Sequence, residues 1–114
     1  HVGTATETRH YVYVGDVARA NALAFEAPAS DVAVNISGPA PAPMLEVLKL
    51  LLAAAGIDLE PELVPPPEGG GLLAVGGSFT IDHKQAAEVL GWRPEVDLPE
   101  GLRRLVAWHR ARGR

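Results

Sequence analysis

A chain of 114 residues is long enough for one modest hydrophobic core and too short for two. Its apolar fraction of 47% and charged fraction of 21% are typical of a globular protein and exclude an intrinsically disordered chain. The net charge is −4, and the only basic cluster is the group of arginines near the C-terminus, so we expect no nucleic-acid partner.

The absence of cysteine excludes disulfide bonds and thiolate metal sites, and it favours a reducing compartment such as the cytoplasm. The longest apolar run, from Val47 to Ile57, contains Lys49 and is too short to span a bilayer, so we expect no membrane partner. No signal peptide is recognisable. The chain begins at His1 rather than at a methionine, and we expect that residues precede it in the parent protein.

The first elements predicted are a short strand followed by a helix. Residues 1–10 are expected to form a loop or a ragged strand. Tyr11 to Val14 are aromatic or β-branched, which favours a strand, and Gly15 ends this run. A helix is predicted from Asp16 to Ala27, with the Asp16 carboxylate as its N-cap, so that Asp16 has a structural role. Its apolar face is formed by Val17, Ala20, Leu23, Ala24 and Ala27.

The run from Val32 to Ile36 is apolar on both sides of the pleat except at Asn35, as in a strand of a parallel sheet that is covered on both faces. In a small isolated unit, that cover has to come from elsewhere. Asn35 is expected to bond the backbone of a neighbouring loop rather than a ligand. If no other element covers the strand at Val32 to Ile36, this strand is a candidate for self-association, because unpaired strand edges and exposed apolar faces attract partners.

The strongest predicted helix runs from Met44 to Ala55. It is rich in Leu, Ala, Glu and Lys, it follows a proline-rich loop, and Gly56 is placed to end it. A short strand is expected at Glu62 to Val64, and a loop containing five glycines from Glu68 to Gly77.

Two further helices complete the chain. After a short strand from Ser78 to Ile81, a helix to Leu90 is predicted to open with a capping box of Asp82 and Gln85, and Gly91 ends it. The last helix is predicted from Leu98 to Arg112. Trp92 and Trp108 are both expected in the core. The chain is therefore expected to be a small mixed α/β unit of four helices and three to four short strands.

Four stretches carry a family resemblance. TETRHYVYVGDVARA (residues 6–20) resembles the T-x-R-D-[FY]-x-x-V-x-D-[VL]-A signature of the extended short-chain dehydrogenase/reductase family, which includes the NAD-dependent nucleotide-sugar epimerases and dehydratases. UDP-glucose 4-epimerase is one of its members. The other stretches occur in the family's order; they are VNISG (34–38), IDHKQA with LGWRP (81–94), and EGL with Trp108 (100–108).

The resemblance spans roughly residues 3–110, yet it corresponds to only the last third of a family enzyme. It implies that residues 1–114 form one substrate-binding C-terminal portion of a Rossmann-fold enzyme, whose N-terminal nucleotide-binding part is absent from this chain. In the family, the strand matched by Val32 to Ile36 extends the sheet of that absent part.

Arg9 is the candidate substrate-binding residue. A guanidinium can hold a pyrophosphate with two parallel N–H donors, and the resemblance implies that Arg9 contacts the diphosphate of a nucleotide sugar. The alternative is a surface arginine paired with Glu7 or Asp16. The family's second diphosphate arginine is missing from the turn PPPEG (65–69), and the family's aspartate after the first arginine is replaced by His10.

No residue of this chain is assigned to catalysis, a cofactor or a metal. The three glycines at 69–71 follow prolines and open no helix, so they make no dinucleotide turn. Neither Lys49 nor Lys84 is preceded by the family's tyrosine four residues earlier. The spacing of His1, His10, His83 and His109 matches no metal site. NAD(P) is implied for the parent enzyme only.

Two hypotheses remain open. In the first, the chain is the substrate-binding portion of a nucleotide-sugar epimerase or dehydratase and acts with the missing Rossmann portion. In the second, it is a stand-alone, non-catalytic remnant that serves as a binding or interaction module and self-associates through Val32 to Ile36. The missing second arginine favours the second hypothesis slightly.

Overall fold

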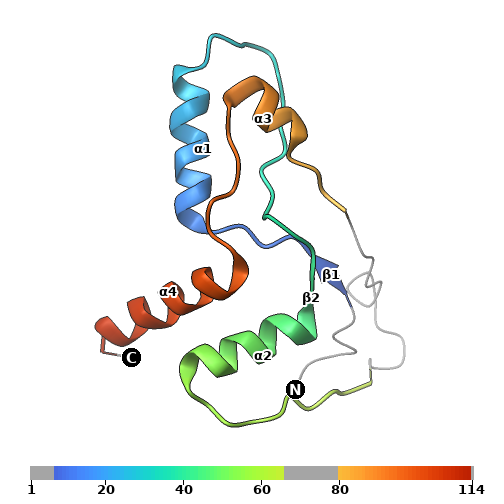
Figure 1. The fold of residues 1–114 in the computed structure, drawn as a ribbon, viewed down its shortest axis with the longest axis vertical. Coiled ribbons are helices and arrows are strands. Elements are labelled where there is room, and N and C mark those ends of the chain that lie inside the picture. Colours follow the sequence, from blue (N-terminus) through green and yellow to red (C-terminus); the bar gives the residue numbers. More distant parts are fainter. Residues whose placement is uncertain (1–6, 66–79, 114) are drawn as a thin grey trace.

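The computed structural model describes residues 7–65 and 80–113. Within them the elements follow in the order β1 (Thr8–Arg9), α1 (Val14–Glu26), β2 (Ala42–Pro43), α2 (Met44–Ala55), α3 (Lys84–Leu90) and α4 (Leu98–Ala111) (Figure 1). The two strands pair antiparallel, with Thr8 opposite Pro43 and Arg9 opposite Ala42. The mixed α/β unit of four helices is confirmed, although the described residues hold only these two short strands. None of the described helices has the length and apolar character needed to cross a membrane.

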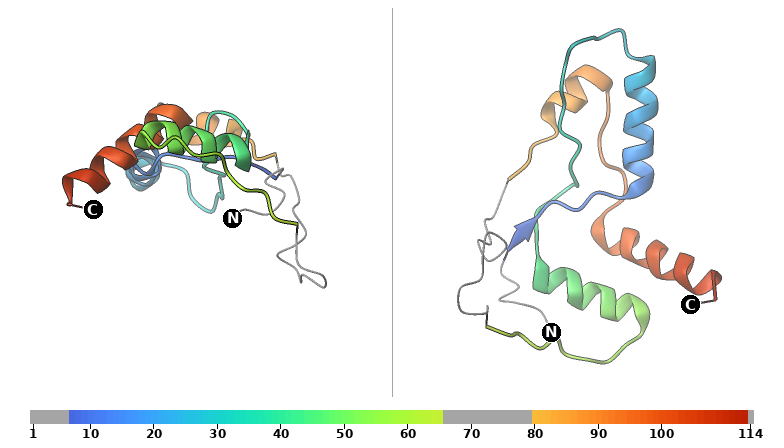
Figure 2. Two further views of the ribbon diagram at one scale, coloured as in Figure 1. Left: turned by 90° about the horizontal axis from the view of Figure 1, so that it is seen from below. Right: turned by 180° about the vertical axis from the view of Figure 1, so that it is seen from behind.

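The molecule is a plate. Its extents are 48 × 39 × 20 Å, so its thickness is only about two helix diameters. Helices α1 and α3 occupy one end of the plate and α2 and α4 the other, while the β1–β2 pair lies between them (Figures 1 and 2). The radius of gyration is 16.9 Å, whereas a compact domain of this length has about 13 Å.

The main core lies at the end that contains α1 and α3. The Trp92 side chain is completely buried there, between Ala20 of α1 and Ala86 of α3, which are 3% and 0% exposed. These two small side chains leave room for the indole between the helices. Partly buried apolar residues surround this cluster, namely Val12, Leu23, Val34, Ile36 and Leu90. The prediction that Trp92 belongs to the core is confirmed.

The strand predicted at residues 11–14 does not form, and α1 begins earlier than predicted. Tyr13 is its N-cap residue, and the Tyr13 carbonyl accepts the N–H groups of Asp16 and Val17 at 3.0 and 3.1 Å. Asp16 therefore lies within the first turn and is not the N-cap. Its carboxylate bonds a distant loop instead. Tyr13 keeps an extended backbone, with φ of −71° and ψ of 138°, but no described strand pairs with residues 11–13.

The strand predicted at residues 32–36 is also absent, because no described strand runs alongside it to supply hydrogen bonds. Val34 and Ile36 point into the core and are partly buried, whereas Val32 is 48% exposed. The expectation for Asn35 is wrong, because its side chain is exposed and makes no hydrogen bond with any residue that the structure describes.

Helix ends were predicted better than strands. The bounds of α2 agree with the prediction, and Gly56 ends this helix with φ of 69°. Gly91 ends α3 with φ of 65°. The capping box is wrong, since α3 begins at Lys84 and Asp82 accepts the Lys84 N–H from one residue before the N-cap. Asp97 caps α4 by accepting the Glu100 N–H at 2.9 Å, and α4 ends at Ala111.

The remaining local predictions concern the middle of the chain. Of the strand predicted at residues 62–64, only a single bridge residue, Leu63, is present. Residues 80 and 81 carry no strand, while residues 78 and 79 and the glycine-rich loop predicted at 68–77 lie outside the described residues.

Candidate functional site

The candidate substrate-binding residue, Arg9, is the second residue of β1 and is exposed. Its backbone is fixed by pairing with Ala42 of β2, which is buried, and by the adjacent hydrogen bond from the Met44 N–H to the Glu7 carbonyl at 2.9 Å. The Arg9 guanidinium makes no ion pair with any residue in 7–65 or 80–113, so neither Glu7 nor Asp16 neutralises it. Within these ranges, a cation without a counter-charge is therefore held on a fixed strand.

The N-terminus of α2 lies beside this strand. Pro43, opposite Thr8 in the ladder, is the N-cap residue of α2, and its side chain cannot accept a hydrogen bond from the first turn. The backbone N–H groups of such a turn attract anions through the helix dipole. Arg9 and the start of α2 are thus neighbours, although the Met44 N–H is already bonded to the Glu7 carbonyl and Glu46 places a negative charge in the first turn.

The segment that carries Arg9 is clamped again at Tyr11. A methyl group on Gly38 would lie 1.6 Å from the Tyr11 carbonyl oxygen, so only glycine permits this close approach of two backbones. The Tyr11 hydroxyl also donates to the Met44 sulfur at 3.5 Å. The segment before α1 is therefore held against Gly38 on one side and against Met44 of α2 on the other.

Asp16 anchors the far end of the same segment. Its carboxylate is buried and accepts the backbone N–H groups of Glu95 and Val96 at 3.1 and 3.0 Å, while its carbonyl accepts the Trp92 indole N–H at 2.8 Å. Arg19 bonds the same carboxylate at 3.4 Å and packs over the Trp92 ring. The structural role predicted for Asp16 is present, but it joins α1 to the loop before α4 instead of capping a helix.

The histidines offer no catalytic arrangement within the described ranges. The buried Ser37 hydroxyl donates to the Ile81 carbonyl at 3.3 Å and lies 3.2 Å from His83 Nδ1. With 1% exposure and its proton already bonded, Ser37 is a poor nucleophile. Both ring nitrogens of His10 are buried and without a hydrogen-bond partner among the described residues. Across these residues, no three His, Asp or Glu side chains gather as metal ligands do.

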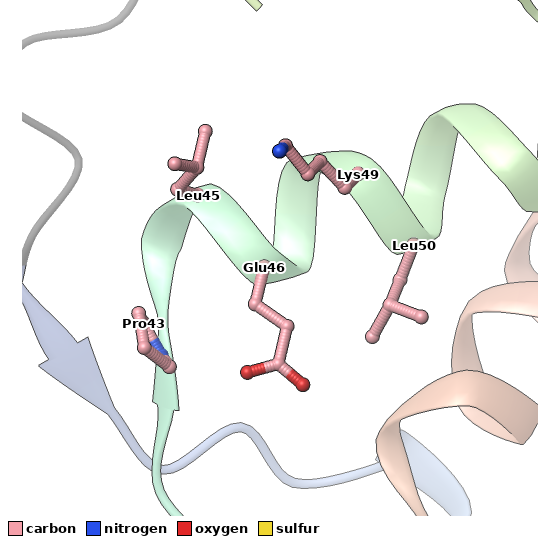
Figure 3. A pocket seen from close by; sticks show the side chains of 5 residues that line it. All are labelled: Pro43, Leu45, Glu46, Lys49 and Leu50. Atoms are coloured by element: carbon pink, nitrogen blue, oxygen red, sulfur yellow. The ribbon is translucent and has the colours of Figure 1, made fainter.

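Two hollows lie near α2. The smaller, of about 430 Å³, is lined by Pro43, Leu45, Glu46, Lys49 and Leu50. Figure 3 shows the Leu45 and Lys49 side chains on one side of α2 and those of Glu46 and Leu50 on the other, so no polar groups converge there. This hollow is an open helix surface and does not have the form of a ligand pocket.

The larger hollow, of about 560 Å³, is an apolar groove that sequence reasoning missed. It lies between the segment before α1, Val47 of α2 and one face of α4. Trp108 lines it and is 54% exposed, so the prediction that Trp108 belongs to the core is wrong. Leu105 and Val14 line it too, at 44% and 73% exposed. Arg9 is not part of this groove.

The comparisons with known proteins agree on one family. The chain is 36% identical to a protein named putative UDP-glucose 4-epimerase of Methanocaldococcus jannaschii, over 93% of this chain and 32% of that protein. It is 31% identical to a dTDP-glucose 4,6-dehydratase of an Actinoplanes strain, over 96% of this chain and 33% of that protein. No family model matches the chain.

The fold gives the same result. The structure of a Thermotoga maritima UDP-glucose 4-epimerase with UDP-glucose superposes with a TM-score of 0.84 at 37% identity, covering 100% of this chain and 35% of that one. By sequence and fold, this chain belongs to the extended short-chain dehydrogenase/reductase family, as the counterpart of the C-terminal part of its NAD-dependent epimerases and dehydratases. It spans about a third of the length of the relatives that it matches.

Proposed function

We propose that this chain is the substrate-binding portion of an NAD-dependent nucleotide-sugar epimerase or dehydratase and that it is not catalytic on its own. The observation that carries the proposal is Arg9, an exposed arginine on a fixed strand with no ion pair among the described residues. The match to two relatives named as nucleotide-sugar enzymes supports it.

In this proposal Arg9 binds the diphosphate of the nucleotide sugar. A diphosphate presents oxygens that a guanidinium can hold with two N–H donors, and the first turn of α2 adds a favourable dipole. The work of this chain is then to bind and orient the substrate. NAD(P) supplies hydride transfer in the complete enzyme, and that cofactor belongs to the portion outside this chain, in keeping with a cytoplasmic setting.

The test of Arg9 uses a joined protein, in which this chain replaces the matching third of the M. jannaschii relative. Isothermal titration with UDP-glucose or dTDP-glucose compares Arg9→Ala with Arg93→Ala, which removes another exposed guanidinium, from the loop after α3. Loss of a charge-assisted hydrogen bond is worth about 1.5–3 kcal/mol, so Arg9→Ala is expected to weaken binding about 10- to 100-fold. Equal Kd values for the two variants would overturn the role of Arg9.

A second candidate function is a stand-alone binding or interaction module. The exposed Val32 and the missing second diphosphate arginine favour it, and its expected behaviour is self-association through residues 32–36. The intact mass of the native protein separates the two functions. A mass near 12.0 kDa supports the module, whereas a mass about three times larger supports a portion of an enzyme.

A further inference from the structure

We propose that Arg9 binds one phosphate of a nucleoside diphosphate sugar and that no other described cation binds the second phosphate. The inference rests on the proposed function and narrows it, because it states how many phosphates this chain can neutralise. It follows from the positions of the charged side chains around Arg9 and in the rest of the chain.

The first argument is the inventory of cations. The chain contains 10 lysine and arginine residues, and all of them except Arg114 lie among the described residues. Residues 1–6 and 66–79 include no lysine or arginine. Arg114 follows the end of α4, which lies on the side of the plate away from β1 (Figures 1 and 2). A second lysine or arginine for the site would therefore have to come from a residue whose surroundings are known.

Most of the other described cations belong to distant elements. The arginines of α4 and of its C-terminal end bond Glu100 or the Ala55 carbonyl, or pack over Trp108; they are Arg103, Arg104, Arg110 and Arg112. Three further cations belong to α1, to α3 and to the loop after α3; they are Arg19, Lys84 and Arg93. None of these residues lies on the β1–β2 pair or on α2.

Lys49 is the remaining described cation, and it belongs to α2. Its Nζ lies 4.0 Å from a carboxylate oxygen of Glu60, so its charge is already paired. Its side chain leaves α2 on the side opposite to that of Glu46 (Figure 3). Within the strand pair and α2, Arg9 is therefore the one cation that has no counter-charge among the described residues.

The second argument is the presence of carboxylates beside Arg9. The bond from the Met44 N–H to the Glu7 carbonyl continues the β1–β2 pairing by one residue. The alternation of an extended segment then places Glu7 and Arg9 on the same face. Glu46 adds a second carboxylate, in the first turn of α2. The Met44 N–H is also occupied by its bond to Glu7, so it cannot bind an anion.

The number of phosphates held follows from this balance of charges. One guanidinium binds one phosphate through two parallel N–H donors. The two carboxylates raise the free energy of a further phosphate placed beside the first, because like charges repel. The second phosphate is therefore left to solvent or to the portion of the enzyme outside this chain. For this chain, a diphosphate offers no more charge-assisted hydrogen bonds than a single phosphate does.

Phosphorus NMR tests this proposal, because the two phosphates of UDP-glucose give separate signals. The joined protein is saturated with UDP-glucose, and the bound signals are compared in the unsubstituted, Arg9→Ala and Arg93→Ala proteins. Arg9→Ala is expected to shift one of the two signals and to leave the other in place, whereas Arg93→Ala is expected to shift neither. The same spectra are recorded with the remaining portion added as a separate chain, in case fusion prevents folding.

A second pair of variants tests the role of the carboxylates. Glu46→Gln removes a negative charge from the first turn of α2, and it is expected to lower the Kd of UDP-glucose about two- to fivefold. Glu88→Gln removes an exposed carboxylate from α3 and is expected to leave the Kd unchanged. Isothermal titration of the joined protein measures both. Equal Kd values for these two variants would overturn the repulsion assigned to Glu46.

The outcomes separate this inference from the proposed function. Comparable shifts of both phosphorus signals in the Arg9→Ala protein would overturn the binding of a single phosphate and leave the proposed function intact. Signals that are both unchanged by Arg9→Ala would show that Arg9 binds neither phosphate. Failure of the unsubstituted joined protein to bind UDP-glucose would overturn the proposed function, and this inference with it.

Discussion

At the scale of single residues, Asp16 does the most to hold the described structure together. Its carboxylate satisfies two backbone N–H groups of the loop before α4, and its carbonyl satisfies the indole of the only large, fully buried apolar side chain in the described core. A substitution at Asp16 removes the carboxylate but not the carbonyl, and loss of a buried acceptor that serves two partly buried N–H groups is costly.

We therefore expect Asp16→Ala to destabilise the joined protein by about 2–4 kcal/mol, and Asp16→Asn by less because one acceptor oxygen remains. Asp58→Ala removes an exposed carboxylate after α2 and is expected to change stability by no more than about 0.5 kcal/mol. Urea unfolding followed by tryptophan fluorescence measures all three. Equal midpoints for Asp16→Ala and Asp58→Ala would show that these hydrogen bonds contribute little.

At the scale of elements, α4 shows how local charges stabilise a helix. Asp97 caps it, Pro99 lies in its first turn, and Glu100 accepts hydrogen bonds from Arg103 and Arg104 on the next turn. The bond from Arg103, and after it the bond from Arg104, hold the pKa of Glu100 below its ordinary value of 4.5. Arg104 also packs over the Tyr13 ring, which joins α4 to the N-cap of α1.

The depressed pKa of Glu100 fixes the sign of a pH effect. The contribution of these bonds is fully present above the ordinary pKa of a glutamate and is lost as the pH falls through the lower pKa of the folded state. We expect a carbon-detected NMR titration to place the midpoint of Glu100 below 4.5. Arg103→Gln should raise that midpoint more than Arg104→Gln does, while Arg110→Gln should leave it unchanged. A Glu100 midpoint that does not change in the Arg103→Gln variant would contradict the structure.

The elements also show what the sequence could predict. The helix at Met44–Ala55 was predicted to the residue, because strong helix formers and a C-terminal glycine act locally. The beginning of α1 was not predictable in this way. The donors that hold the Asp16 carboxylate, at Glu95 and Val96, lie about eighty residues away in the sequence.

The candidate site likewise has features that the sequence could predict and features that it could not. The role of Arg9 was predicted from the resemblance of residues 6–20 to a family motif, and it stays a prediction. The apolar groove and the exposed Trp108 were not found, since periodicity shows that a helix face is apolar but not whether another element covers it. For the strand predicted at residues 32–36, the pattern describes a sheet whose other strands are not among the described residues.

At the scale of the whole molecule, the plate shape follows from the way in which the core is divided. Ala20, Ala86 and Trp92 form a small cluster at one end, whereas Val47 and Ala42 are buried near the other. Alanines contribute little apolar area, so hydrophobic burial within this chain is weak for its length. Ten large apolar side chains of the described residues, Phe25 and Trp108 among them, are exposed and add nothing to the core.

The division of the core into two small parts predicts how the isolated chain unfolds. The urea m-value scales with the area that unfolding exposes, and a chain that already exposes 8263 Å² has less area left to expose. With Trp108→Phe, fluorescence reports only the buried Trp92, and we expect a broad transition with an m-value below that of a compact domain of equal length. In a joined protein whose remaining portion contains no tryptophan, the same probe should unfold at higher urea and more steeply, because contacts with that portion would couple the Trp92 cluster to a larger body. A steep transition in the isolated chain, unchanged by joining, would mean that the plate is a complete folding unit.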